Sequence, residues 1–272
     1  MGEAQLSGTR NIKTSQKAKL VFPDDFRPDF EGFRPAAFAF LRGLAQNNER
    51  DWFKARREIY DAELQFPMEC LVAEFRPGGA GDELPVRGDP KKAIFRIHRD
   101  VRFSKNKNPY KAHVGAILSR SGARSEAGVV YIHFQPGACF ISAGFWRLDN
   151  VPLAAWRTRI AENPQEWLNI TGAYTDPKGE TFMRSISTLK TMPRGFREYA
   201  DSPVAEFIRW KSYLMTRRVS DKEASDRGLV EIVRKHALRA TPLLNYGWEI
   251  TDLPDDDDPR RHMRGPSHQG RI

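Results

Sequence analysis

The sequence predicts an α+β fold in which an antiparallel sheet of about four or more strands has helices packed mainly on one face. Apolar residues recur at helical spacing over residues 33–75 and again after residue 150. Between them, residues 93–146 alternate as strands do and are broken by short turns. Because short connections favour antiparallel neighbours, we expect a meander within a single globular domain over residues 21–252.

The helices of the first part are indicated by an apolar stripe and by residues that favour helix starts. A first helix is expected to begin near Pro35. Asn48 is a candidate cap for a second helix, which Pro67 should kink or replace with a new one. The stripe of the first helix consists of Phe33, Ala37, Phe40, Leu41 and Leu44. The Gly- and Pro-rich run at residues 76–90 predicts a surface loop before the strands.

The strand-rich part is expected to hold four strands, at residues 93–103, 113–119, 128–134 and 138–146. The last third returns to helix. Ser202 with Pro203 predicts a helix start, and Lys211 falls on the apolar stripe of the helix that would follow. Ser220 and Glu223 have the spacing of a capping box before another apolar stripe that begins at Leu229.

Both ends of the chain lack apolar periodicity. Residues 1–20 are polar and basic, and residues 253–272 join an acidic run to a basic one. Such segments bury too little apolar surface to offset the entropy of ordering, so both are expected to be disordered tails.

The cysteines and the hydropathy pattern indicate a cytoplasmic protein. Cys70 and Cys139 lie far apart in apolar surroundings, which is typical of buried thiols and not of a disulfide framework. Neither a signal-peptide core nor a run of about 18 apolar residues is visible, so we expect no membrane partner.

Positive charge is concentrated in one segment. The chain has a net charge of +9, and residues 91–111 alone hold eight basic residues against one acid, Asp100. An anionic partner, either nucleic acid or a phosphorylated metabolite, follows as an expectation.

The first half of this basic segment alternates like a strand. Arg96, His98, Asp100 and Arg102 would line its polar face. Arg99 would enter the opposite, apolar face together with Phe95, Ile97, Val101 and Phe103. Since a buried guanidinium needs a partner, Arg99 is expected to be buried against an acid, a group of carbonyls or an anionic ligand.

The second half of the segment combines mobile lysines with an Asn108-Pro109 turn and a tyrosine, but it lacks the glycines of a phosphate-binding loop. The candidate ligand-binding residues are Arg96, Arg99, Arg102, Lys105, Lys107, Tyr110 and Lys111.

Three interpretations of the function stay open. In the first, the protein is a binding module for a phosphate-bearing or other polyanionic ligand. In the second, it is an enzyme that acts on a phosphorylated small molecule, with Asp100 or His98 as acid or base. In the third, it is a structural or interaction protein whose charges form internal ion pairs.

Other kinds of site have weaker support. His98, His113 and His133 lie on neighbouring predicted strands, but histidines in sheets are usually satisfied by hydrogen bonds, so no metal is expected. The motifs of serine hydrolases, zinc proteases and dinucleotide-binding folds are absent, and we expect no cofactor.

Three strings of residues resemble one family, the domain of unknown function 2461. The central string R-D-x-R-F-S-K-x-K-x-P-Y-K runs from Arg99 to Lys111. The others are Phe40, Leu41, Leu44, Asn47, Asn48, Arg50, Trp52 and Phe53, and Leu189, Lys190, Pro193, Arg194, Gly195 and Phe196. The sequence departs from the family pattern at Asn106, where Asp is usual, and at His98, where Tyr is usual. The resemblance implies a domain over roughly residues 33–245 and implies no reaction.

Overall fold

A five-stranded antiparallel sheet forms the centre of the protein in the computed structural model, which describes residues 29–172 and 181–252. The strands are β1 (Val114–Leu118), β2 (Val129–Phe134), β3 (Cys139–Phe145), β4 (Thr181–Arg184) and β5 (Tyr213–Val219), in the order β1-β2-β3-β5-β4. The predicted α+β class and the meander of β1, β2 and β3 are confirmed. The expected tails at residues 1–20 and 253–272 lie outside the described residues.

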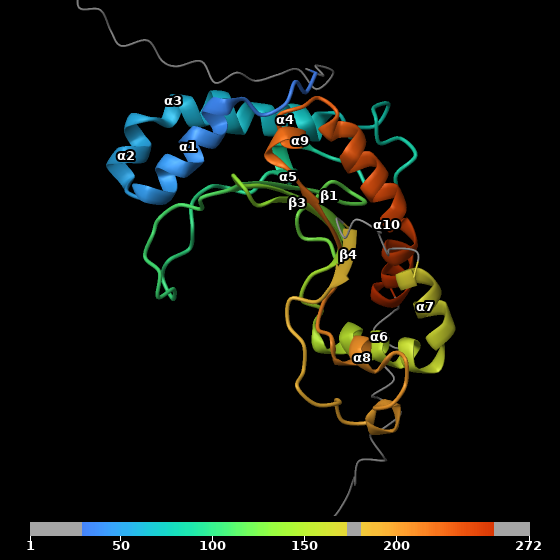
Figure 1. The fold of residues 1–272 in the computed structure, drawn as a ribbon. Coiled ribbons are helices and arrows are strands. Elements are labelled where there is room, and N and C mark those ends of the chain that lie inside the picture. The colour runs from blue at the N-terminus through green and yellow to red at the C-terminus, as the bar shows by residue number, and fades with distance from the viewer. Residues whose placement is uncertain (1–28, 173–180, 253–272) are drawn as a thin grey trace, which may run out of the picture.

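The first predicted strand, at residues 93–103, is wrong. A short helix, α5 (Pro90–Ala93), precedes an extended segment whose backbone pairs with the sheet at the isolated bridge between Ile94 and Ala116. The chain then folds back on itself: Lys111 donates its backbone N–H to Ile97. The backbone hydrogen bonds of this stretch are therefore used within the excursion of residues 97–111, which projects beside the sheet in Figure 1.

Strands β4 and β5 were not predicted from the sequence. The apolar residues near 204–214 indicated one helix, but α8 (Ala205–Arg209) ends before Trp210. Lys211, expected on that helix, lies exposed in the connection to β5. Since β5 is buried on both faces over its first four residues, it lacks the alternation that marks a half-exposed strand.

The amino-terminal helices are α1 (Pro35–Gln46), α2 (Arg50–Ala55), α3 (Arg57–Tyr60), the π-helical turn η1 (Asp61–Gln65) and α4 (Phe66–Ala73). Pro67 lies in the first turn of α4, so it opens a new helix as predicted. Asn48 does not cap α2, whose cap position is Glu49. Its side chain instead bonds both backbone groups of Tyr110, accepting from the N–H at 3.0 Å and donating to the carbonyl at 3.1 Å.

The carboxyl-terminal half contains α6 (Asn150–Glu162), α7 (Pro164–Gly172), the 3₁₀ turn η2 (Arg197–Tyr199), α9 (Asp221–Ala224) and α10 (Leu229–Thr251). The capping box of Ser220 and Glu223 is confirmed at the start of α9. The start predicted at Ser202 and Pro203 is wrong, because α8 begins at Ala205 after the uncapped Val204.

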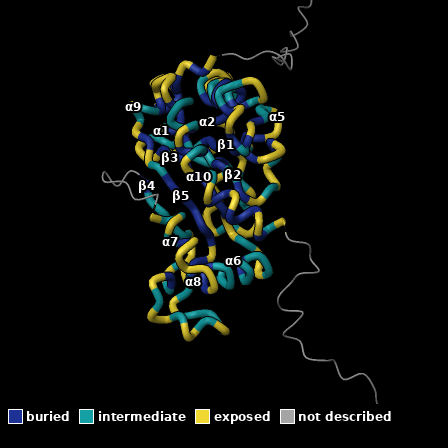
Figure 2. Tube along the Cα trace, turned by 90° about the vertical axis from the view of Figure 1, so that its right-hand side faces the viewer, coloured by how far each residue is buried: buried dark blue, intermediate teal, exposed yellow. Residues whose placement is uncertain are grey.

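The core lies between the sheet and the helices. In Figure 1, α10 runs along the side of the sheet that α4 also covers, and the strands are largely buried in Figure 2. Phe134 of β2 stacks on Phe33 with ring centres 3.9 Å apart, and Trp156 of α6 stacks on Tyr213 of β5 at 4.4 Å. Both cysteines are buried and free, as predicted.

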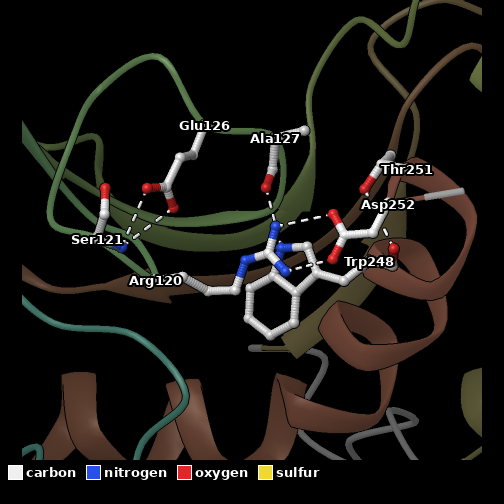
Figure 3. Close-up of polar contacts among 7 residues, drawn as sticks. All are labelled: Arg120, Ser121, Glu126, Ala127, Trp248, Thr251 and Asp252. Atoms are coloured by element: carbon white, nitrogen blue, oxygen red, sulfur yellow. Dashed lines mark hydrogen bonds and ion pairs between the residues drawn. The ribbon is translucent and has the colours of Figure 1, made fainter. Parts of the chain in front are cut away.

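The carboxyl-terminal end of α10 is tied to the loop between β1 and β2 (Figure 3). Arg120 forms a two-bond ion pair with Asp252 and lies over the ring of Trp248 at 4.8 Å. Trp248 donates its indole N–H to the carbonyl of Ala127 at 3.0 Å. Within residues 29–172 and 181–252, no helix is both long and apolar enough to cross a membrane.

Candidate functional site

The pairing of the strands separates the sheet into two chemically different faces. One face, the core face, includes Phe134, Ile141 and Met215, which are at most 1% exposed. The opposite face, which we call the second face, follows from the register that pairs Gly115 with His133, His133 with Phe140 and Phe140 with Arg218. Its strand residues are Gly115, Ile117, Val129, Tyr131, His133, Phe140, Ser142, Gly144, Phe182, Arg184, Leu214, Thr216 and Arg218. No carboxylate occurs at these strand positions.

Aromatic rings cross the second face from strand to strand. Phe95, beside β1, meets Tyr131 of β2 edge-on at 5.9 Å between ring centres, and Tyr131 lies 5.8 Å from Phe140 of β3. All three side chains are half-buried. Gly115 makes this row possible, since a Cβ atom there would lie 2.7 Å from the hydroxyl of Tyr131.

Two histidines lie against this row. His133 stacks on Phe140 at 4.5 Å, and its ring centre is 4.3 Å from that of His113. The ring nitrogens of His133 bond Tyr131 at 3.0 Å and Gln135 at 3.2 Å. Burial, followed by the neighbouring His133 and Lys111, lowers the pKa of His113 to about 4, so its imidazole is neutral near pH 7.

Three cations gather at the β1 end of the row. The ammonium of Lys111 and the guanidinium of Arg124 lie 5.4 and 5.7 Å from the centre of the Phe95 ring. Burial, followed by the positive charges of Arg96 and Arg124, lowers the pKa of Lys111. Arg124 donates one bond to the carbonyl of Ile94 at 2.8 Å. We call Arg96, Lys111 and Arg124 the inner cationic group.

The inner group has no carboxylate partner among the described residues. The charge of Arg96 does act on Asp100, but the pKa of that carboxylate is lowered first by hydrogen bonds from Arg102 and only last by Arg96. Lys111 is half-buried, whereas Arg96 and Arg124 are exposed. Repulsion of Lys111 by these like charges is unfavourable, and an anion bound there would reduce it.

The other predicted cations of the segment lie on the excursion and are exposed, as Arg96 also is. Arg102 is held by Asp100 in a two-bond pair at 2.7 and 3.0 Å, and Lys107 donates to the carbonyl of Val101 at 3.1 Å. Lys105 is exposed as well. We call Arg102, Lys105 and Lys107 the outer cationic group, which the structure separates from the inner one.

Two predicted ligand-binding residues have local structural contacts. Arg99 is half-buried instead of buried, because the segment that holds it is an excursion and not a sheet strand. Its guanidinium donates a long hydrogen bond of 3.4 Å to the hydroxyl of Ser104. For the same reason Phe103, expected in the core, is 96% exposed. Tyr110 is 6% exposed and stacks on Phe53 with ring centres 4.3 Å apart.

His98 lies apart from the other two histidines, against Tyr110 at 5.1 Å between ring centres. Partial burial, followed by the charges of Arg57, Arg96 and Arg50, lowers its pKa. Within the described ranges, no group of three metal-ligating side chains comes together.

Several site residues were missed from the sequence. Arg124, Arg184 and Arg218 lie far from the basic segment, and β4 and β5 were not predicted. The alternation of Tyr131 with His133 was visible, but which face they share with Phe140 depends on the register of β2 and β3. That register carried no signal in the sequence.

The family model described as conserved hypothetical protein (DUF2461) matches residues 36–246, which is most of the chain. The chain belongs to this family. The DUF2461 match spans the first helix, the sheet and most of α10, and it agrees with the extent that the three strings indicated. No curated protein and no solved structure matches the chain at a significant level.

Proposed function

We propose that this DUF2461 protein is a binding module for a phosphate-bearing, polyanionic ligand, and that the inner cationic group is its site. The observation that carries the proposal is the position of Lys111. Its side chain is half-buried, its pKa is lowered first by burial and then by the charges of Arg96 and Arg124, and no carboxylate among the described residues contacts it. A bound phosphate group supplies the missing negative charge and accepts charge-assisted hydrogen bonds.

The outer cationic group contributes less to this site, for physical reasons. Arg102 already pairs with Asp100, and exposed lysines are screened by salt beyond about 10 Å at 0.1 M ionic strength. These residues attract polyanions over a distance and do not define where the ligand binds.

Catalysis by Asp100 or His98 has no comparable support. The pKa of Asp100 is lowered by its hydrogen bonds with Arg102, which holds the carboxylate in an exposed pair. Within the part of the chain that the structure describes, Asp100 bonds Arg102 and does not bond His98.

The test compares two variants that each remove three positive charges from the same segment and its surroundings. In the inner variant Arg96, Lys111 and Arg124 are each replaced by Gln, and in the outer variant Arg102, Lys105 and Lys107 are. The probe is inorganic tripolyphosphate, titrated by calorimetry at several salt concentrations.

We expect the inner variant to lose at least about tenfold in affinity, since hydrogen bonds to charged groups contribute about 1.5–3 kcal/mol each. The outer variant should lose about threefold or less, as expected for screened surface charge. Equal losses would show that the attraction is diffuse net charge without a site. If the unaltered protein does not bind tripolyphosphate, the binding proposal is wrong, and the third interpretation, a structural or interaction protein with internal ion pairs, is favoured.

A further inference from the structure

The positive charges on the second face are not confined to the inner cationic group. The guanidinium of Arg184 on β4 reaches across β5 to lie 5.9 Å from the ring centre of Phe140, and that of Arg218 lies 5.2 Å from Phe182. The Nε atom of Arg184 is buried and has no hydrogen-bond partner among the described residues. A second cationic region therefore lies at the β4 and β5 end of the face.

The two cationic regions are too far apart for one phosphate group. Phe95 flanks β1, and Phe140 lies on β3, three strand intervals away in the sheet order. Neighbouring strands are about 4.8 Å apart, so the backbones that carry the two rings are roughly 14 Å apart. Their ring centres, which lie 5.9 and 5.8 Å from that of Tyr131, are no more than about 12 Å apart. A ligand that contacts Lys111 and Arg184 together must carry more than one phosphate.

Half-buried rings occupy the space between the cations. Tyr131, His133 and Phe140 lie between them with no carboxylate among the strand positions of this face. Alternating rings and cations on a sheet are the combination that holds bases by stacking and phosphates by charge. A ligand of phosphates alone would leave the rings unused.

We propose that the second face binds single-stranded nucleic acid, with phosphates at the inner cationic group and at Arg184, and with bases against the rings between them. This rests on the proposed function, because it uses the inner group as one end of the path. What it adds to the proposed function is the class of ligand, a single-stranded nucleic acid, and the second end of its path, at Arg184.

The preference for single strands follows from the position of the rings. Bases stack on protein rings only when their own faces are free, and in a duplex each base is already stacked on its neighbours. Rings that lie down on a sheet, as Tyr131 does over Gly115, offer no projecting helix or ribbon for a duplex groove.

The test measures fluorescence anisotropy of a labelled 12-nucleotide single strand of mixed sequence, over a series of salt concentrations. Competitors are the same sequence as a duplex, a mononucleotide and inorganic tripolyphosphate. The variants are Phe140→Ala, Phe140→Leu, Arg184→Gln and the inner variant defined above. The matched controls are Phe66→Ala and Arg42→Gln, which change a ring and a charge on helices of the opposite side.

We expect Phe140→Ala and Phe140→Leu each to weaken single-strand binding by about tenfold, or about 1.4 kcal/mol, without changing the salt slope. Arg184→Gln should reduce the slope of log affinity against log salt by about 0.7, the value for one lost single-strand phosphate contact. The controls should change neither quantity. Phe140→Leu preserves apolar bulk, so a loss in both variants with unchanged thermal unfolding reports stacking and not misfolding.

Other outcomes overturn the proposal in distinguishable ways. If tripolyphosphate competes as well as the unlabelled strand does, the anion site stands and the nucleic-acid path is wrong. The same conclusion follows if the Phe140 and Arg184 variants bind the strand normally while the inner variant does not. Preference for the duplex would also overturn it. If the inner variant too binds the strand normally, the proposed function fails with it.

Discussion

The core face and the second face of the sheet are built from the same strands, yet they carry different chemistry. On β2, Phe134 is 1% exposed and stacks on Phe33, whereas the adjacent His133 is half-buried and bonds Tyr131 and Gln135. Because successive side chains point to opposite faces, one strand can stabilise the fold with one set of residues and present polar groups with the other. Substitutions on the two faces should therefore have different effects on stability and binding.

The largest difference is expected from removing a ring on each face. Phe134→Ala should lower the free energy of unfolding by about 3–5 kcal/mol, since it leaves a cavity between Phe33 and Phe38. Phe140→Ala should cost about 1 kcal/mol, the scale of a cross-strand pair. Urea unfolding monitored by circular dichroism measures both. Similar large losses would mean that the second face is also a structural core.

The next effect is a loss of stability in acid caused by His236 of α10, which packs on the core side. Its ring is 3% exposed and bonds the carbonyl of Met215, and burial lowers its pKa from 6.5 to about 4. The unfolded chain therefore binds the proton more readily than the folded protein between these values. The stabilising contribution is complete above pH 6.5 and is lost as the pH falls toward 4, by up to about 3 kcal/mol.

Unfolding measured between pH 4 and pH 7 tests this contribution. His236→Gln removes the titrating group and should flatten the dependence of unfolding free energy on pH, compared with the unaltered protein. An unchanged slope in this variant would assign the acid sensitivity to other groups.

A smaller effect distinguishes His113, which has a similarly low pKa but lies on the second face beside Lys111. A phosphate bound at the inner cationic group should raise the pKa of His113 by about one unit, because an opposite charge within about 4–6 Å favours the protonated ring. His236 should not respond. Imidazole resonances followed by NMR against pH, with and without tripolyphosphate, give both values, and a parallel shift of the two would indicate a global change.

The smallest effect is expected at Gly115. A methyl group there would displace the flexible end of the Tyr131 side chain, so Gly115→Ala should cost about 1 kcal/mol or less in stability. It should nevertheless weaken ligand binding, since it moves the ring that connects Phe95 to Phe140. Gly172→Ala, which meets no atom within 4 Å, is the control. Normal binding by Gly115→Ala would exclude Tyr131 from the ligand path.

The sequence was sufficient for features that depend on local spacing. The capping box at Ser220, the start of α1 and the alternation of β2 are all confirmed. It was insufficient where long-range pairing decides. Along residues 96–102, more exposed and less exposed side chains alternate as they do in a strand. The backbone groups of this segment nevertheless form hydrogen bonds within the excursion instead of with the sheet. The candidate site was likewise predicted in part, with Arg96 and Lys111 named and Arg124 and Arg184 not.

The way the last helix closes the domain has a consequence for how the chain folds during synthesis. Phe33 bonds Ala224, and Trp248 bonds Ala127, so both contacts join residues far apart in the chain. Moreover, β4 pairs only with β5, which is made later, and β3 is covered by α10, which is made last. Such non-local contacts give a high contact order and slow folding. Until residues near 250 leave the ribosome, the part of the meander that α10 covers, mainly on β3, exposes its apolar side, which favours binding of the nascent chain by chaperones.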